Sequence, residues 1–148
     1  MNLDSKKIML GLYLRGNALD PCDITAILGI SPDYQQVKGE SVPSSAGRAI
    51  TRTIGVWSIK VDAASENIAE PLAEFLTRLN GLIEWGARNS STLLSLPGVD
   101  EGYVDMFVCG SLDTDDQGKV EVEIQPDQVA LLAKLHLPLR ITFELVRE

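Results

Sequence analysis

The side chains that most often do chemistry are few in this chain, and they are scattered. His136 is the only histidine, and the two cysteines, Cys22 and Cys109, stand far apart without CxxC spacing. A Ser-His-Asp or Cys-His triad would have to use His136, yet no cysteine or serine lies in a nucleophile-elbow context. His136 follows a short predicted helix, where an imidazole commonly meets the last carbonyl groups or faces water. The sequence therefore predicts no catalytic residue, and it favours free structural thiols over a metal site.

Signatures for binding phosphate are also missing. The chain has no GxxxxGKS loop and no GxGxxG after a predicted strand. Its formal net charge of -8 opposes a nucleic-acid backbone, and Arg48, Arg52 and Lys60 make only a thin basic group. We therefore expect neither a cofactor nor a nucleic-acid partner.

One stretch has the opening of a calcium-binding loop. Asp113, Asp115 and Gln117 place oxygen ligands at alternating positions, and Gly118 follows as the turn glycine. The bidentate glutamate of such a loop should stand six residues later, where this chain has Ile124, and the flanking segments are predicted strands. We interpret the stretch as a solvated hairpin turn, with weak cation binding as the alternative.

Acidic residues are concentrated between positions 100 and 127. This segment holds nine acids against the single Lys119, which accounts for the whole charge surplus of the chain. Such a field could attract a basic partner, while the plain alternative is that the acids keep the protein soluble and protect sheet edges. The candidate partner-binding residues are Asp105, Asp113, Asp115, Asp116, Glu121 and Glu123.

A second candidate region is the long connection from 31 to 55, because long loops in compact domains often carry function. The candidate ligand residues of this region are Lys38, Glu40, Arg48 and Trp57. Arg48 could clamp a carboxylate or phosphate, or it could pair internally with Glu40 or Asp33. Trp57 alternates with polar neighbours, which is more typical of a core anchor than of a binding platform.

Hydrophobic periodicity predicts the elements that would position these residues. A helix of about two turns begins after Asp20 and ends at Gly29, and the longest helix begins near 67–71 and carries an apolar stripe to Ile83. A third, short helix follows Pro126. Alternating apolar residues predict five strands, at 8–14, 57–61, 104–108, 120–124 and 139–145. The turn at 113–118 would join two of them into a hairpin, and the order is β-α-β-α-β-β-α-β.

These elements predict one domain over residues 1–148 with an α+β fold. Strands with one apolar and one mixed face favour a two-layer sandwich, a mostly antiparallel five-stranded sheet with helices on one face. The face left uncovered would carry Tyr13, Arg15, Ser58, Lys60, Tyr103, Asp105, Phe107, Glu121, Glu123, Arg140, Thr142 and Glu144. No run approaches the roughly 18 apolar residues of a membrane helix, and the N-terminus is typical of a strand, so we expect a cytoplasmic protein without a membrane partner.

Four segments of the chain resemble a known bacterial family. They are 24–33, with Leu28-Gly29 before Pro32-Asp33, then 38–40, Arg48 and 57–59. The resemblance is to the family catalogued as domain of unknown function 4279, and it covers nearly the full length. It implies a shared order of elements, and it carries over no activity, cofactor or catalytic residue.

The sequence thus favours a non-enzymatic cytoplasmic binding protein. One recurrent class of small acidic proteins is the immunity protein that neutralises a basic, nuclease-type toxin, here through the acidic hairpin and the open sheet face. A small-molecule-binding domain or unusual enzyme that uses the loop 38–57 is one alternative. A self-associating structural subunit, a homodimer, is another.

Overall fold

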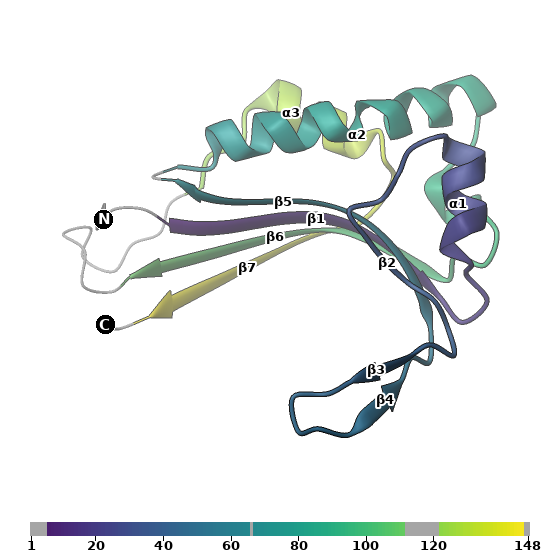
Figure 1. Ribbon diagram of the computed structural model, residues 1–148. Helices are drawn as coiled ribbons and strands as arrows, with labels where there is room; N and C mark the ends of the chain where they lie inside the picture. The colour runs from purple at the N-terminus through teal and green to yellow at the C-terminus, as the bar shows by residue number, and fades with distance from the viewer. Residues whose placement is uncertain (1–5, 66, 112–121, 147–148) are drawn as a thin grey trace.

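The computed structural model describes residues 6–65, 67–111 and 122–146, and it shows a curved sheet beneath a layer of helices (Figure 1). The main sheet has five strands in the order β2-β5-β1-β6-β7. Every pairing is antiparallel except that of β6 with β7, which is parallel. The predicted α+β architecture, a mostly antiparallel five-stranded sheet with helices packed on it, is confirmed.

Three long strands form the centre of the sheet. They are β1 (Lys6–Gly16), β5 (Gly55–Ser65) and β6 (Glu101–Ser111), each of eleven residues. The middle strand is β1, which pairs with both of the others over almost its whole length. Its even-numbered residues from Ile8 to Leu14 are fully buried beneath the helices, whereas Tyr13 and Arg15 lie on the opposite face. Period-two alternation therefore sets which side chains face the core.

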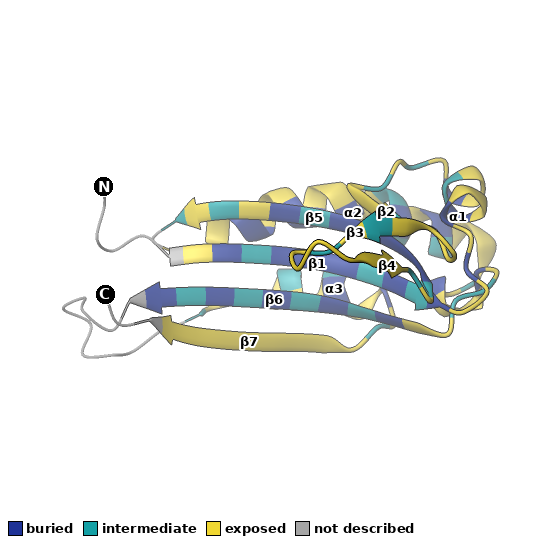
Figure 2. Cartoon of the chain, turned by 60° about the horizontal axis from the view of Figure 1, so that its bottom comes forward, coloured by how far each residue is buried: buried dark blue, intermediate teal, exposed yellow. Residues whose placement is uncertain are grey.

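The two edges of the sheet differ greatly in length. On one side, β2 (Tyr34–Gln36) has only three residues, and on the other β7 (Leu139–Val146) has eight. A separate two-stranded sheet of β3 (Ser41–Pro43) and β4 (Ala49–Thr51) projects on the side of the main sheet that the helices leave open (Figures 1 and 2). The long connection predicted for residues 31–55 thus contains all three short strands.

The helical layer consists of α1 (Pro21–Leu28), α2 (Ala69–Asn89) and α3 (Pro126–Ala133), with a single 3₁₀ turn, η1 (Leu93–Ser95). At the start of α1, the Asp20 carboxylate accepts from the Cys22 N–H at 3.0 Å, and the helix ends at Gly29 in the left-handed conformation. Both signals were predicted from the sequence. The apolar stripe of α2, from Leu72 to Leu82, lies against the sheet and closes the core.

The predicted strand at 120–124 is wrong for the part that the structure describes. Residues 122–125 have no strand pairing, and the two neighbours of β6 are β1 and β7. Residues 104–108 therefore form no hairpin with 122–124, the part of the predicted strand that the structure describes. Val122 and Ile124 are nevertheless half-buried against the core from the loop before α3, which explains their apolar alternation without a sheet. The fifth strand of the main sheet is instead β2, which the sequence did not predict. The predicted turn at 113–118 lies outside the described residues.

Candidate functional site: the open face of the sheet

The face of the sheet turned away from α2 carries one row of aromatic and basic side chains, with one member on each strand. In strand order the row consists of Tyr34 on β2, Lys60 on β5, Tyr13 on β1, Tyr103 on β6 and Arg140 on β7. We call these five residues the aromatic row. It contains all three tyrosines of the chain.

The members of the aromatic row contact one another from edge to edge. Tyr13 and Tyr103 face each other directly in the β1–β6 register, and their rings stack with centroids 5.3 Å apart and planes 24° apart. The Lys60 Nζ lies 4.8 Å from the centre of the Tyr34 ring and 5.5 Å from that of Tyr13. The Arg140 guanidinium carbon lies 3.9 Å from the centre of the Tyr103 ring. Both cations are therefore within the range of cation–π attraction.

A glycine in the middle of β1 makes room for this arrangement. A Cβ atom on Gly11 would stand 2.5 Å from Cε2 of Tyr13 and 3.0 Å from its Cζ. The Tyr13 ring therefore lies over the backbone of Gly11. A glycine inside a strand often marks such a close approach, because it has no side chain to keep the neighbour away.

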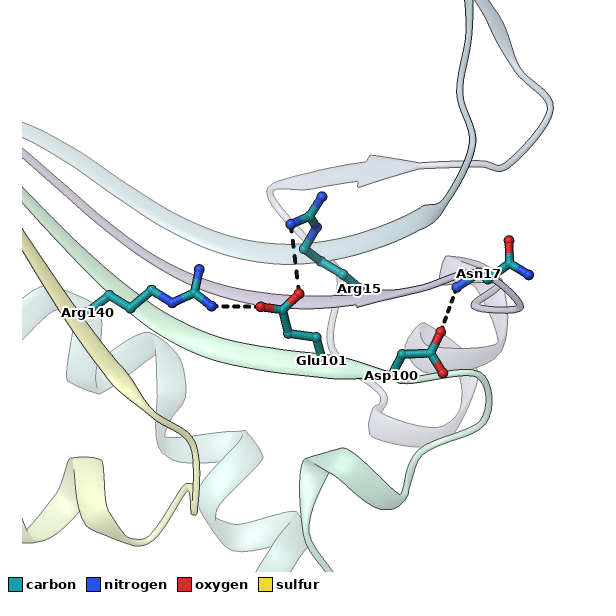
Figure 3. A network of polar contacts seen from close by, with 5 residues as sticks. All are labelled: Arg15, Asn17, Asp100, Glu101 and Arg140. Atoms are coloured by element: carbon teal, nitrogen blue, oxygen red, sulfur yellow. Dashed lines mark hydrogen bonds and ion pairs between the residues drawn. The ribbon is translucent and has the colours of Figure 1, made fainter.

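An ion-pair cluster holds the β7 end of the row (Figure 3). The Arg140 Nη2 donates to Oε1 of Glu101 at 2.7 Å, and the Arg15 Nη1 lies 3.9 Å from Oε2 of the same carboxylate. Beside them, the backbone N–H of Asn17 donates to Oδ2 of Asp100 at 2.9 Å. The two pairs of Glu101 are too exposed to stabilise the fold by much, so their main effect is to orient Arg140 over Tyr103.

Under the row lies a buried hydroxyl with no hydrogen-bond partner among the described residues. Ser58 is directly opposite Tyr34 on one side and Tyr13 on the other, and none of its surface reaches solvent. Its position on the uncovered face was predicted, but its burial was not. An unsatisfied buried hydroxyl destabilises a fold, so the burial of Ser58 has a cost that no hydrogen bond among the described residues offsets.

The predicted partner-binding acids separate into three places. Asp105 is half-buried on the open face of β6, in register with Arg140. Glu123 is exposed in the loop before α3, where its Oε1 accepts from Nε2 of Gln125 at 3.2 Å, so its predicted place on a strand of the open face is wrong. The remaining four lie outside the described residues: Asp113, Asp115, Asp116 and Glu121.

The structure does not bring the candidate ligand residues of the long connection together. Trp57 is fully buried on the core face of β5, where its Nε1 donates to Oγ1 of Thr25 at 3.0 Å. Lys38 instead donates to Oδ1 of Asn17 at 2.8 Å. In the same connection, the Arg48 N–H donates to Ser44 Oγ at 3.2 Å, while the Glu40 carbonyl accepts from the Arg52 N–H at 2.8 Å.

The carboxylate of Asp33, one expected partner for Arg48, is paired with Arg78 of α2 at 2.8 Å. Trp57 thus belongs to the core, whereas Lys38, Glu40 and Arg48 are exposed loop residues. A ligand-binding role for these residues stays a prediction.

On the helical side, a groove of about 680 Å³ lies between α2 and the end of α3. Ile83 and Leu131 form apolar parts of its lining, and Glu84, Lys134 and His136 bring polar groups to it. Within residues 6–65, 67–111 and 122–146, no group of three or more His, Cys, Asp or Glu side chains could hold a metal ion. No helix in the same ranges is long and apolar enough to cross a membrane.

Sequence reasoning placed four members of the aromatic row on the uncovered face but did not recognise them as a site. Tyr34 was missed altogether, because it lies in the segment predicted to be a connection. The available signal was that the other two tyrosines, Tyr13 and Tyr103, both occupy outward positions of long strands. That they meet depends on the register between β1 and β6, which the sequence does not reveal.

The fold and this site define an α+β two-layer protein whose open sheet face is lined by mutually contacting aromatic and charged side chains. A family model described as Domain of unknown function (DUF4279) matches residues 6–145, and the chain belongs to this family. No curated protein matches the chain. No solved structure matches it either.

Proposed function

We propose that this is a non-enzymatic binding protein and that a basic protein docks on the open face, with the aromatic row at the centre of the contact. The observation that carries the proposal is the continuous chain of ring and cation contacts across all five strands. The three helices of the described residues lie on the other face of the sheet (Figure 1), so they leave open the face that carries the aromatic row and every tyrosine of the chain.

The composition of the row supports binding of a protein. Tyrosine and arginine are enriched among the residues that contribute most to protein–protein affinity, because they combine a large apolar surface with a polar tip. In this protein the rings are already ordered by the Tyr13–Tyr103 stack and by Lys60. A partner that docks on them would lose little conformational entropy, since the side chains are fixed before binding.

Charge supports a basic partner. The chain has a formal net charge of -8, which favours the approach of a basic protein and raises the rate of encounter. On the open face, Lys60 and Arg140 already lie over rings, whereas Asp62 and Glu144 are exposed at the far ends of β5 and β7. We propose that the protein acts in the cytoplasm. More specifically, we propose that it is an immunity protein that covers the active site of a nuclease-type toxin.

The test is co-expression of the full chain with the product of the adjacent gene, followed by co-purification at low salt and a calorimetric titration. Tyr103→Ala and Lys60→Ala each remove one member of the aromatic row. Residues at the centre of an interface typically contribute about 2 kcal/mol, so we expect each variant to raise the Kd at least about tenfold. Circular dichroism should show that both variants remain folded.

Two controls make the same kinds of change away from the open face. Leu94→Ala removes a side chain of η1 that is 42% exposed, and Arg88→Ala removes an exposed cation of α2. Both should bind as the unchanged protein does. If no basic protein is retained at low salt, or if the row variants bind as well as these controls, the proposed function is wrong.

The groove between α2 and α3 favours a second candidate function, the binding of a small molecule. Its volume of about 680 Å³ lies in the range of ligand pockets, and it combines Ile83 and Leu131 with the polar groups of Glu84 and His136. A thermal-shift screen with nucleotides and metal ions tests this candidate. A stabilising compound should lose its effect in Ile83→Arg, which fills the groove, and keep it in Tyr103→Ala.

A further inference from the structure

The two edges of the sheet are protected to very different degrees. At one edge, β2 offers only three residues to another strand. At the other, β7 offers eight, and its helix-side residues are apolar but 39–48% exposed. Natural proteins usually shorten an edge strand or give it charges, prolines or bulges that prevent pairing with another chain. The segment Leu139–Val146 contains no proline and no lysine, and its two charged residues, Arg140 and Glu144, have opposite signs, so this edge is less protected against pairing than that of β2.

The backbone groups of β7 show which residues would make such a pairing. The Pro138 carbonyl accepts from the Val104 N–H of β6 at 2.8 Å. Because peptide groups alternate along a strand, the even-numbered residues of β7 direct their N–H and C=O groups toward β6. The odd-numbered residues direct theirs away from the sheet, toward a strand that the described residues do not supply. These are Leu139, Ile141, Phe143 and Leu145.

We propose that β7 pairs antiparallel with β7 of a second copy of this chain, with Thr142 on the two-fold axis. In this register each odd-numbered residue meets another odd-numbered residue, so the two strands exchange about eight backbone hydrogen bonds. The two five-stranded sheets would become one continuous sheet. The contact is isologous, which is the usual symmetry of a homodimer.

The charges of Arg140 and Glu144 favour this register over those centred on other residues of β7. With Thr142 on the axis, Arg140 lies directly opposite Glu144 of the second copy, and the same pair recurs on the other side of the axis. With Ile141 on the axis, Arg140 would face Thr142 of the second copy. With Phe143 on the axis, Glu144 would face that same threonine. Registers centred on Arg140 or Glu144 would place like charges opposite each other, which is unfavourable.

The apolar face of β7 fits the same register. Leu139 would face Leu145 of the second copy, and Ile141 would face Phe143 of the second copy. These four side chains are on the helix side of the sheet, in register with the buried Val104, Met106 and Val108 of β6, yet each is exposed by 39–48%. Pairing would continue the apolar layer of the core across the axis and would remove part of this surface from water.

Sedimentation of the full chain over a range of concentrations tests the proposal. We expect a species of twice the 16.1 kDa chain mass that dissociates on dilution. Glu144→Arg places arginines opposite each other on both sides of the axis, so the dimer Kd should rise about ten- to hundredfold. Glu74→Arg makes the same charge change on the exposed side of α2 and should leave the Kd unchanged.

Two further measurements test the register itself. Arg140→Glu should also weaken the homodimer, but an equimolar mixture of Arg140→Glu and Glu144→Arg should recover a heterodimer, because each facing pair again joins opposite charges. In hydrogen exchange, the amides of Ile141 and Phe143 should be protected only at dimer-forming concentrations, whereas those of Arg140 and Thr142, which point to β6, should be protected throughout.

A chain that stays monomeric at every concentration would overturn the proposal, and the edge would then be available only to a strand of another protein. A dimer that Glu144→Arg leaves intact would overturn it too, as would a mixture that recovers no heterodimer. Partner binding on the open face can fail while this dimer forms, and the reverse also holds, because one test measures mass and the other measures affinity for a basic protein.

Discussion

Replacement of Gly11 by alanine tests whether the close approach of the Tyr13 ring is real. Gly11 lies in the middle of β1 outside the left-handed region, so alanine fits its backbone without strain. The new Cβ would stand 2.5 Å from Cε2 of Tyr13, and the three atoms nearest to it all belong to that side chain. The backbone can stay in place, but the ring has to swing away from its position.

Two opposing effects set the size of the change. Alanine reduces the conformational freedom of the unfolded chain, which alone raises the free energy of unfolding by about 0.5–1 kcal/mol. The displaced Tyr13 ring loses its stack on Tyr103, worth about 0.5–1.5 kcal/mol, and its contact with Lys60, worth about 0.5–1 kcal/mol. We therefore expect Gly11→Ala to lower the free energy of unfolding by roughly 1 kcal/mol in the unchanged background.

The same substitution should have the opposite sign when Tyr13 is absent. In a Tyr13→Ala background the obstructing ring is gone, so only the entropic effect remains, and Gly11→Ala should raise the free energy of unfolding by about 0.5–1 kcal/mol. Urea unfolding of the four proteins, followed by circular dichroism, gives the complete double-mutant cycle.

The sign of the effect in the two backgrounds decides the outcome. If Gly11→Ala stabilises both backgrounds, the Tyr13 ring does not depend on the glycine, and the geometry of the aromatic row is wrong. If it destabilises both equally, the glycine is required by the backbone of β1 and not by the ring. Only a change of sign supports the contact between Gly11 and Tyr13.

Two further substitutions test the layers on either side of β5. Ser58→Ala removes a buried hydroxyl that has no hydrogen-bond partner among the described residues, so it should raise the free energy of unfolding by roughly 1 kcal/mol in urea titrations. A loss of stability would show that the hydroxyl is satisfied. Trp57→Phe leaves a void in the core and removes the donor to Thr25, so we expect the free energy of unfolding to fall by about 2–3 kcal/mol. A fall of less than about 1 kcal/mol would contradict the fully packed position of the indole.

Much of the fold could be predicted because its long elements have strong periodicity. The alternation from Ile8 to Leu14 and the stripe from Leu72 to Leu82 each correspond to a buried face in the structure. In contrast, β2 has only three residues and no apolar alternation, so its place in the sheet comes from pairing with β5. The error at 120–124 has a related cause, because Val122 and Ile124 contact the core from a loop and imitate a strand.

The aromatic row could be predicted only in part. Period two places Tyr13, Lys60, Tyr103 and Arg140 on the uncovered face, which is a property of each strand taken alone. That they form one row depends on three pairings between strands far apart in the sequence, including a parallel pairing of β6 with β7. The sequence predicted an antiparallel neighbour from residues 120–124 at that position, so Arg140 could not be placed beside Tyr103.

Arg140 connects the two proposals, because it ends the aromatic row and also faces Glu144 of the second copy in the proposed dimer. Its Nη2 bonds to Glu101, but its side chain is 52% exposed, and a guanidinium has five N–H donors. It can therefore keep its bond to Glu101 and donate to a second carboxylate without leaving the Tyr103 ring. A dimer formed in this way would fix Arg140 further and so order one end of the binding face.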